Sequence, residues 1–437
     1  MDYWGFLRQA LSILLGVKPV EFTRSNFLLL RVLLLSLLLL VGVNSFAEKP
    51  DRNKISETEY LTQANNEFGF ALFENLALDE AGENVFISPL SIHLALNMTY
   101  MGSESETGTE MAKVLGLSGL TKKEVAELAR ELLTKTDELP DVKISIANSI
   151  WARKGLPFKK SFLKTGENYF QARIEELGFG SPDALKTINR WVKENTNGKI
   201  EKIVKKLNPL DVMVLLNAIY FEGPWKNQFE EENTREMPFH LLEGAKKQIP
   251  MMIRSGNFSY FENDKFQLIR LPYGKKEPMA AYIVLPREEQ GLNELIKTVD
   301  PRAWENWISS MKRVYGRFGL PRFTLRYEEK LNAALKDMGM QLSFNEEEAD
   351  FSGIIDIPNQ NAFISEVRHK TFLEVTERGT KAAAATSVKM RLTSLAPEEE
   401  EFEMIVDRPF LFAIRYEESG ELLFLGGVRN PGRIREK

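Results

Sequence analysis

The 437-residue chain is predicted to fold as one large α+β domain behind an apolar amino-terminal segment. Three observations predict this class. Apolar residues recur at helical spacing early in the chain, whereas alternating or continuous apolar runs gather later. No long Gly-, Pro- or Ser-rich linker divides the chain after residue 56. No internal repeat is visible, so a single domain is favoured over several.

The amino terminus has the features of an export signal. Residues 27–43 are almost wholly apolar, with Arg24 and Arg31 near their start and the small residues Ser45 and Ala47 behind them. This order predicts a signal peptide over residues 1–47, cleaved after Ala47, and hence a secreted or extracytoplasmic protein, periplasmic or at the cell surface. An uncleaved membrane anchor is the alternative, although the uninterrupted apolar run covers only about 12 residues, fewer than a spanning helix needs. Residues 1–23 are long and partly apolar for the beginning of a signal peptide. A start codon that is placed too early is one interpretation.

The remaining residues, 48–437, are expected to form the single domain, and helices are predicted first. Apolar residues at helical spacing indicate an amphipathic helix over 55–76. A second helix is predicted to open at Ser88-Pro89, since proline is favoured in a first helical turn. Thr121 to Glu124 has the pattern of a capping box and predicts a third. A later helix containing Trp191 is expected to end near Gly198.

Strands are predicted next. Residues 142–151 alternate polar and apolar side chains, as in a half-buried strand. Residues 212–221 (VMVLLNAIYF) are almost continuously apolar, as in a strand covered on both faces. Helices are expected from Leu292 and Tyr327. Five further segments are strand-like, the last two joined by a hairpin turn: 266–272, 279–286, 363–375, 410–416 and 421–428.

Composition excludes several classes of function. The chain has no cysteine, so disulfides, thiol nucleophiles and thiolate metal sites are impossible. Its three histidines, His93, His240 and His369, lie far apart and lack the spacing of zinc ligands. The net charge is −5 with basic and acidic residues interleaved, which argues against nucleic acid as a partner. We therefore expect no metal, no cofactor and no nucleic-acid site.

One segment breaks the local rules. Four alanines at 382–385 favour a helix, yet the segment continues into residues 387–392 (SVKMRL), which alternate as a strand does. Extended backward, the alternation places Thr380, Ala382, Ala384 and Thr386 on one face and Lys381 on the other. Such a segment could lie exposed as a loop, or slot into a sheet with its small residues buried. A flexible alanine-rich linker is the plainer interpretation.

The context of this segment favours a loop that can insert into a sheet over a flexible linker. Residues 379–386 resemble the hinge of the reactive loop in inhibitory serpins. Four other stretches, in the same order along the chain, resemble further signatures of that family: Asn84–Ile92, Asn217–Trp225, Asp407–Phe412 and Phe424–Pro431. The resemblance extends from about residue 55 to residue 433.

The resemblance implies a serpin fold, with three β-sheets, eight or nine helices and an exposed reactive loop over about 377–405. It also implies a monomeric suicide-substrate inhibitor of serine-type proteases. In this mechanism a protease cleaves the loop, and the freed hinge inserts into the largest sheet before the acyl-enzyme can be hydrolysed. The energy is stored in a metastable native state.

Individual residues follow from the resemblance. Trp225 matches the tryptophan of the breach, where insertion begins. Lys381 departs from the usual glutamate, but it lies on the outward face, so little loss of inhibition is expected. Ser88, Ser91, Asn217 and His369 match the shutter, the polar cluster that controls opening of the sheet. The hinge comprises Glu377, Gly379, Thr380, Ala382, Ala383, Ala384, Ala385 and Thr386.

The resemblance places the reactive bond sixteen residues beyond Glu377, at Thr393-Ser394. A small residue there suits elastase-like or subtilisin-like proteases. Cleavage after Arg391 would suit a trypsin-like protease and cleavage after Leu392 a chymotrypsin-like one. Downstream, the acidic stretch 397–403 is interpreted as a solvated spacer, or as a charge that steers a basic protease.

Two other functions compete with inhibition. An enzyme is disfavoured because the chain lacks a Gly-x-Ser-x-Gly elbow, and its only plausible base, His369, lies in an apolar, strand-rich context. A non-inhibitory serpin, acting as a chaperone, carrier or structural binding protein, is the stronger alternative. Such members usually carry bulky, charged or proline residues in the hinge, whereas here only Lys381 departs from the inhibitory pattern.

Overall fold

The computed structural model describes residues 55–80, 82–355, 362–380 and 401–432. The chain divides into two compact units, residues 1–55 and 56–437, and the second holds nearly all the described residues. Within the described ranges, no helix combines the length and apolarity needed to cross a membrane. The predicted signal peptide and the predicted reactive bond at Thr393-Ser394 lie outside the described residues.

The helices begin where the local sequence favours a start. The side chain of Ser88 accepts a hydrogen bond from the backbone of Ser91, and Pro89 occupies the first turn behind it. Both bonds of the predicted capping box between Thr121 and Glu124 are present. The described ranges contain nine α-helices: α3 Glu57–Asp79, α4 Pro89–Tyr100, α5 Ser105–Val114, α6 Lys122–Asp137, α7 Lys160–Phe170, α8 Pro182–Asn195, α9 Leu292–Thr298, α10 Pro301–Ser309 and α11 Asn332–Asp337. Short 3-10 turns cover Glu231–Asn233, Leu242–Gly244 and Leu342–Phe344.

A six-stranded sheet has the order β10-β11-β12-β4-β2-β3. The central β4 is buried along most of its length, as its continuous apolar run predicts. The strands are β2 Lys143–Arg153, β3 Arg173–Leu177, β4 Met213–Pro224, β10 Phe323–Lys330, β11 Glu366–Thr376 and β12 Gly379–Thr380.

A nine-stranded sheet has the order β1-β15-β14-β8-β7-β6-β9-β13, with β5 paired to β6. The long β6 pairs with β5, β7 and β9, and it thereby joins two parts into one hydrogen-bonded ladder. The described residues therefore form two continuous sheets, where three were expected. The strands are β1 Val85–Ile87, β5 Thr234–His240, β6 Lys246–Glu262, β7 Phe266–Tyr273, β8 Met279–Pro286, β9 Lys312–Pro321, β13 Phe402–Ile405, β14 Phe410–Tyr416 and β15 Leu422–Val428.

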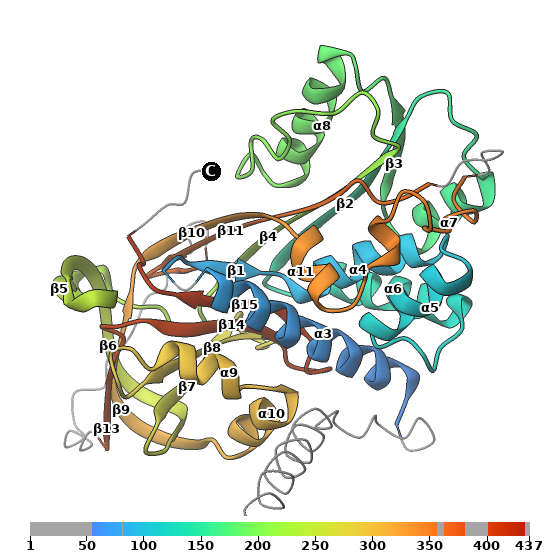
Figure 1. Ribbon diagram of the computed structural model, residues 1–437. Helices are drawn as coiled ribbons and strands as arrows, with labels where there is room; N and C mark the ends of the chain where they lie inside the picture. The colour runs from blue at the N-terminus through green and yellow to red at the C-terminus, as the bar shows by residue number, and fades with distance from the viewer. Residues whose placement is uncertain (1–54, 81, 356–361, 381–400, 433–437) are drawn as a thin grey trace, which may run out of the picture. The chain divides into compact units, whose positions relative to one another are not determined.

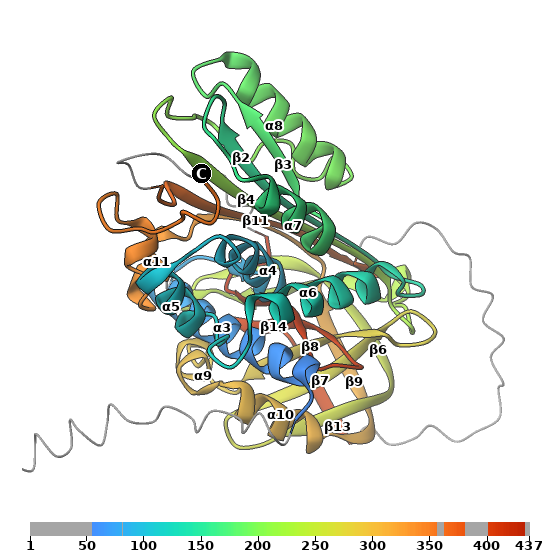
Figure 2. The same ribbon diagram turned by 90° about the vertical axis from the view of Figure 1, so that its right-hand side faces the viewer.

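Helices cover both faces of the six-stranded sheet. Figures 1 and 2 show α8 on one face, and α4 and α6 on the other. Beneath α8, side chains from the helix, from residues 200–207 and from three strands form one apolar cluster that includes Trp151, Ile188 and Phe372. The sheet's central strands are therefore enclosed between two helical layers.

Two sequence expectations need correction. The helix predicted from Tyr327 begins only at Asn332, because residues 323–330 form β10, which pairs along its whole length with β11. The acidic stretch 397–403 is not wholly a solvated spacer. Its end belongs to β13, where Phe402 is buried and stacks on Tyr260 with ring centroids 3.9 Å apart.

Candidate functional site

The six-stranded sheet contains a seam between β4 and β11. These strands pair directly, in parallel, from Val214 with Glu366 to Tyr220 with Phe372. At the end of the seam beyond Phe372, β12 lies between them and is antiparallel to both. The sheet is therefore already open at one end, by the two residues Gly379 and Thr380, and closed along the rest.

The backbone conformation at position 379, at the open end of the seam, requires glycine. Its φ is +142°, a conformation that side chains rarely adopt, and a Cβ there would lie 2.2 Å from the carbonyl oxygen of Gly223. The Thr376 hydroxyl donates to the carbonyl of Gly379 over 2.9 Å and closes the tight turn between β11 and β12.

Thr380 is buried and anchored to an aromatic pair. Its hydroxyl lies 2.7 Å from the hydroxyl of Tyr273, whose ring stacks on Trp225 at 4.3 Å. Burial raises the pKa of Tyr273 far above its ordinary range, so the phenol stays protonated. Trp225 in turn donates from its backbone to Arg378 and from Nε1 to Thr376, over 3.0 and 2.9 Å. The predicted breach residue Trp225 and the predicted hinge residue Thr380 thus meet at this point, whereas residues 382–386 of the predicted hinge lie outside the described residues.

Glu377 is buried on the other side of the same turn. Its carboxylate accepts a hydrogen bond of 2.8 Å from Thr234 and lies 3.7 Å from the guanidinium of Arg322. Its carbonyl accepts from the backbone of Phe229 over 2.9 Å. Glu377, the first residue of the predicted hinge, is therefore fixed to both β5 and the loop before β5.

The four predicted shutter residues lie together beneath the seam. The backbone of Ser88 donates to His369 Nε2 over 3.1 Å, so the ring proton is on Nδ1, which lies 2.5 Å from Asn217 Oδ1. The Asn217 amide donates to the carbonyl of Ser91 over 2.9 Å and to its hydroxyl. Burial lowers the pKa of His369 to about 3, so the ring is neutral.

A fifth residue completes this cluster. The Asn217 amide also donates to the side chain of Asn148 over 2.5 Å, so the cluster reaches a third strand, β2. Sequence reasoning missed Asn148. The available signal was an asparagine on the apolar half of an otherwise well-alternating strand, which indicates a buried polar contact.

The opposite face of the seam is covered by α8 and the loop behind it. Asn189 holds the loop through its side chain, which binds the backbone of Ile203 and Val204. Lys370 on β11 donates to the carbonyl of Lys202 over 2.7 Å. A strand inserted into the seam would therefore have one face toward the shutter and the other toward this loop.

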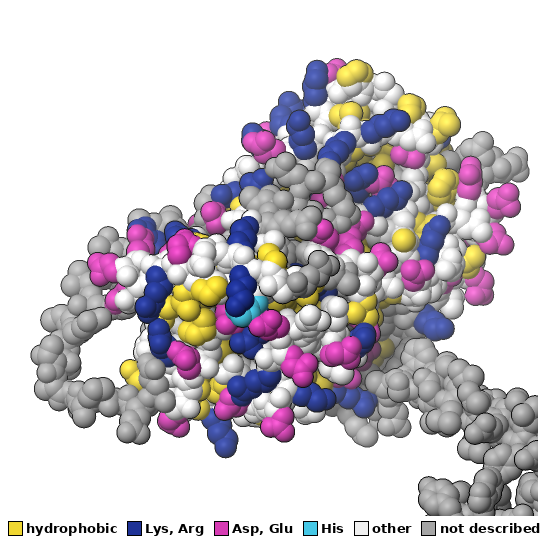
Figure 3. Space-filling model, turned by 60° about the vertical axis from the view of Figure 1, so that its left-hand side comes forward, with side chains coloured by type: hydrophobic (Ala, Val, Ile, Leu, Met, Phe, Trp, Pro, Cys, Tyr) yellow, Lys and Arg dark blue, Asp and Glu magenta, His cyan; other side chains and the backbone are white. Residues whose placement is uncertain are grey.

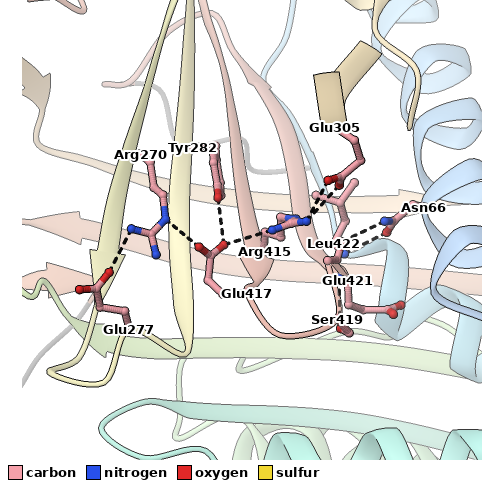
Figure 4. Close-up of polar contacts among 11 residues, drawn as sticks. Asn66, Arg270, Glu277, Tyr282, Glu305, Arg415, Glu417, Ser419, Glu421 and Leu422 are labelled. Carbon is pink, nitrogen blue, oxygen red and sulfur yellow. Dashed lines mark hydrogen bonds and ion pairs between the residues drawn. The ribbon is translucent and has the colours of Figure 1, made fainter. Parts of the chain in front are cut away.

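A network of ion pairs leads away from the breach along the nine-stranded sheet. It runs in order through Lys226, Glu277, Arg270, Glu417, Arg415 and Glu305, and Figure 4 shows it from Glu277 onward. The Arg270–Glu417 contact is 2.7 Å long, and Tyr282 donates to the same carboxylate over 3.0 Å. The network connects Lys226, the residue after Trp225, to Glu305 on α10. Three of its five contacts join residues at least 51 positions apart, so local patterns do not reveal the network.

The surface charge agrees with the composition. Figure 3 shows basic and acidic side chains mixed over the face that carries the one histidine that is not buried. This is His240, which pairs with Glu289. The described residues contain no cluster of three metal-ligating side chains.

The comparisons with known proteins agree with this architecture. The family model described as serpin (serine protease inhibitor) matches residues 63–431. The chain belongs to the serpin family. Human leukocyte elastase inhibitor is 34% identical over 386 residues, which cover 85% of this chain and 100% of that protein.

Two solved structures place the fold within the same family. The native structure of the thermophilic serpin tengpin matches with a TM-score of 0.78 and 34% identity, over 86% of this chain and 95% of that one. Human thyroxine-binding globulin complexed with thyroxine matches with a TM-score of 0.78 and 27% identity, over 86% and 100%. The family thus includes protease inhibitors as well as members with other roles.

Proposed function

We propose that this serpin is a suicide-substrate inhibitor of serine-type endopeptidases. It traps the acyl-enzyme when the cleaved reactive loop inserts as a new strand between β4 and β11. The single observation that carries the proposal is the position of β12, which already occupies one end of the seam in antiparallel register with both neighbours. Extension of β12 along the seam requires no change of direction.

The register supports insertion of the following residues. Thr380 pairs with Gly223 and Val375, so Thr386, six residues further on, falls level with Asn217 and His369. The face toward the shutter would receive Ala382 and Ala384 before it, which are small enough to slide between the strands. An inserted strand would also gain ladder hydrogen bonds on both sides, which favours the inserted state.

The chemistry follows from the loop's role as substrate. The serine hydroxyl of the protease attacks the carbonyl carbon of Thr393, and the amide nitrogen of Ser394 takes a proton and leaves with the carboxyl-terminal segment. An ester then joins the two proteins. Insertion must outrun hydrolysis of that ester. Cleavage after Thr393 suits elastase-like or subtilisin-like proteases. Cleavage after Arg391 would suit a trypsin-like protease, and cleavage after Leu392 a chymotrypsin-like one.

Denaturing gel electrophoresis tests the proposal. The chain without residues 1–47 is mixed with an elastase-like, a subtilisin-like, a trypsin-like and a chymotrypsin-like protease. We expect a complex that survives denaturation with at least one of them. Mass spectrometry of the released carboxyl-terminal peptide would identify the reactive bond. Cleavage by all four without any stable complex would contradict inhibition.

The structural similarity to thyroxine-binding globulin favours one second candidate, a non-inhibitory serpin that acts as a carrier. This role predicts that loop cleavage changes ligand binding but never yields a covalent complex. The same gels therefore separate the two candidates.

We also propose that the protein acts outside the cytoplasm as a monomer, after removal of residues 1–47. The apolar segment behind basic residues supports export. Amino-terminal sequencing of the protein expressed with its full leader is expected to start at Glu48. Retention of the segment in the membrane fraction would favour the anchor.

A further inference from the structure

The face of the seam that lies toward α8 carries charges at defined levels. On both strands the even-numbered residues point to this face: Val214, Leu216, Ala218, Tyr220 and Phe372 all belong to the cluster beneath α8. Glu374 shares this face and contacts Lys199, in the loop after α8. By the same alternation, Glu222 on β4 also faces α8.

Glu222 and Glu374 lie on opposite sides of β12. Thr380 is level with Gly223 and Val375. In the proposed inserted strand the next residue, Lys381, would therefore fall level with both glutamates. Neighbouring strands are about 5 Å apart, which brings a lysine ammonium within reach of the carboxylates on either side.

Both carboxylates are suited to bind a cation. Among the described residues, Glu222 has no ion-pair partner, and its carboxylate accepts only the hydroxyl of Tyr220, over 3.0 Å. Glu374 already pairs with a lysine, since Lys199 Nζ lies 3.4 Å away. The pKa of Tyr220 is raised mainly by burial and further by both glutamates, so the two carboxylates act on one phenol.

At the other register positions of the seam, the outward side chains of the segment would meet no like charge on β11. In the proposed inserted strand, Lys389 would fall level with Glu366 on β11, an acid that also pairs with Arg368. In the same inserted strand, Ala385 and Ser387, which carry no charge, would fall level with the basic residues Lys370 and Arg368. Across five outward positions, from 381 to 389, no cation of the segment meets a cation of β11.

We infer that Glu222 and Glu374 form an acidic bracket that binds Lys381 during insertion and thereby holds the inserted strand in register. The inference rests on the proposed inhibitory function and adds the side chains that position the strand. It also explains why a lysine is tolerated at this point of the hinge. Glu222 and Glu374 are positioning residues, because neither touches the reacting bond.

The stoichiometry of inhibition, meaning inhibitor molecules consumed per protease trapped, tests the bracket. Lys381→Glu places three carboxylates together, so insertion slows and more inhibitor is hydrolysed as substrate. We expect the stoichiometry to rise about fivefold. The double variant Glu222→Gln with Glu374→Gln is expected to raise it less, because it removes attraction without adding repulsion.

Charge exchange provides the decisive comparison. Adding Glu222→Lys to Lys381→Glu restores a pair of opposite charge and is expected to return the stoichiometry toward that of the wild type. Glu176→Gln removes a carboxylate from β3, at the far edge of the sheet, and is the matched control that should change nothing. Unchanged stoichiometry in Lys381→Glu, or no recovery in the exchanged variant, would overturn the bracket.

A thermal measurement gives an independent readout. Loop cleavage allows insertion without a trapped protease, so the rise in Tm on cleavage reports the stability of the inserted strand. We expect a smaller rise for Lys381→Glu than for the wild type, and recovery in the exchanged variant. Equal rises in all three would also overturn the bracket. The two proposals can also fail separately. If the wild type forms no covalent complex, but the rise in Tm on cleavage still depends on the charge at position 381, inhibition is contradicted and the bracket is retained.

Discussion

Nδ1 of His369 and Oδ1 of Asn217 lie 2.5 Å apart, across the seam between β11 and β4. The two residues are register partners on these strands, and both side chains are buried. A strand inserted at their level must break this hydrogen bond. The contact therefore opposes opening of the sheet.

Asn217→Ala is expected to destabilise the native fold. The substitution leaves the Nδ1–H of His369 and the carbonyl of Ser91 without their buried partner, at a cost of about 2–4 kcal/mol. Urea unfolding of the uncleaved protein measures the change. Asn195→Ala, at an exposed position of α8, is the control. Equal losses of unfolding free energy in the two variants would show that the hydrogen bonds of Asn217 stabilise the fold no more than those of an exposed asparagine.

Acidification is expected to weaken the fold through His369. In the unfolded chain this histidine gains a proton below its ordinary pKa of 6.5, whereas burial lowers the pKa in the folded chain to about 3. The contribution of His369 to the free energy of unfolding should therefore fall by about 1.4 kcal/mol per pH unit as the pH drops between these values, and it should stay constant above them. Unfolding of the wild type and of His369→Gln between pH 7 and pH 4 checks this. Parallel pH profiles would refute it.

Gly379→Ala is expected to displace β12 from the seam. A Cβ would collide with the carbonyl of Gly223, and the positive φ adds strain of about 2 kcal/mol. Protease trapping should slow by about tenfold or more. Gly155→Ala tests positive φ alone, because a Cβ there would meet nothing within 4 Å. An unchanged rate for Gly379→Ala would show that β12 need not occupy the seam before cleavage.

Thr380→Arg is expected to make the protein a substrate of proteases instead of the inhibitor proposed above. The buried site that holds the threonine against Tyr273 cannot accommodate a long charged side chain without large cost. Gels should show cleaved protein in place of the covalent complex. Thr380→Ser keeps the hydroxyl and should still form the complex. Normal complex yield from the arginine variant would argue against strand insertion.

Glu421→Gln is expected to stabilise the protein at neutral pH. Glu421 is buried between the β14–β15 turn and α3, close to Asn66, as Figure 4 shows. Burial raises its pKa to about 8 from 4.5, an effect that Thr62 only partly offsets. The wild type therefore loses about 1.4 kcal/mol of unfolding free energy per pH unit between those values. The Tm advantage of the variant should widen from pH 5 to pH 8, and a constant difference would contradict this.

Much of the fold could be predicted from local patterns. The capping box at Thr121, the apolar run of β4 and the alternation of β2 each depend on residues a few positions apart. The strands β5, β6 and β9 were not predicted, because their burial alternates irregularly where β6 changes partners. The helix expected from Tyr327 failed for a similar reason: pairing with β11 decides the conformation of residues 323–330.

Local patterns are enough to show that side chains of one kind alternate over residues 380–392, and to predict shutter, breach and hinge residues from short motifs. The position of β12 between β4 and β11, the contact of Asn148 with Asn217, and the place of Glu222 one register position beyond Thr380 depend on the tertiary structure. The reason is physical. Periodicity reports which face of a strand is buried, but strand register depends on pairing between segments more than 140 residues apart, and local sequence carries no measure of that pairing.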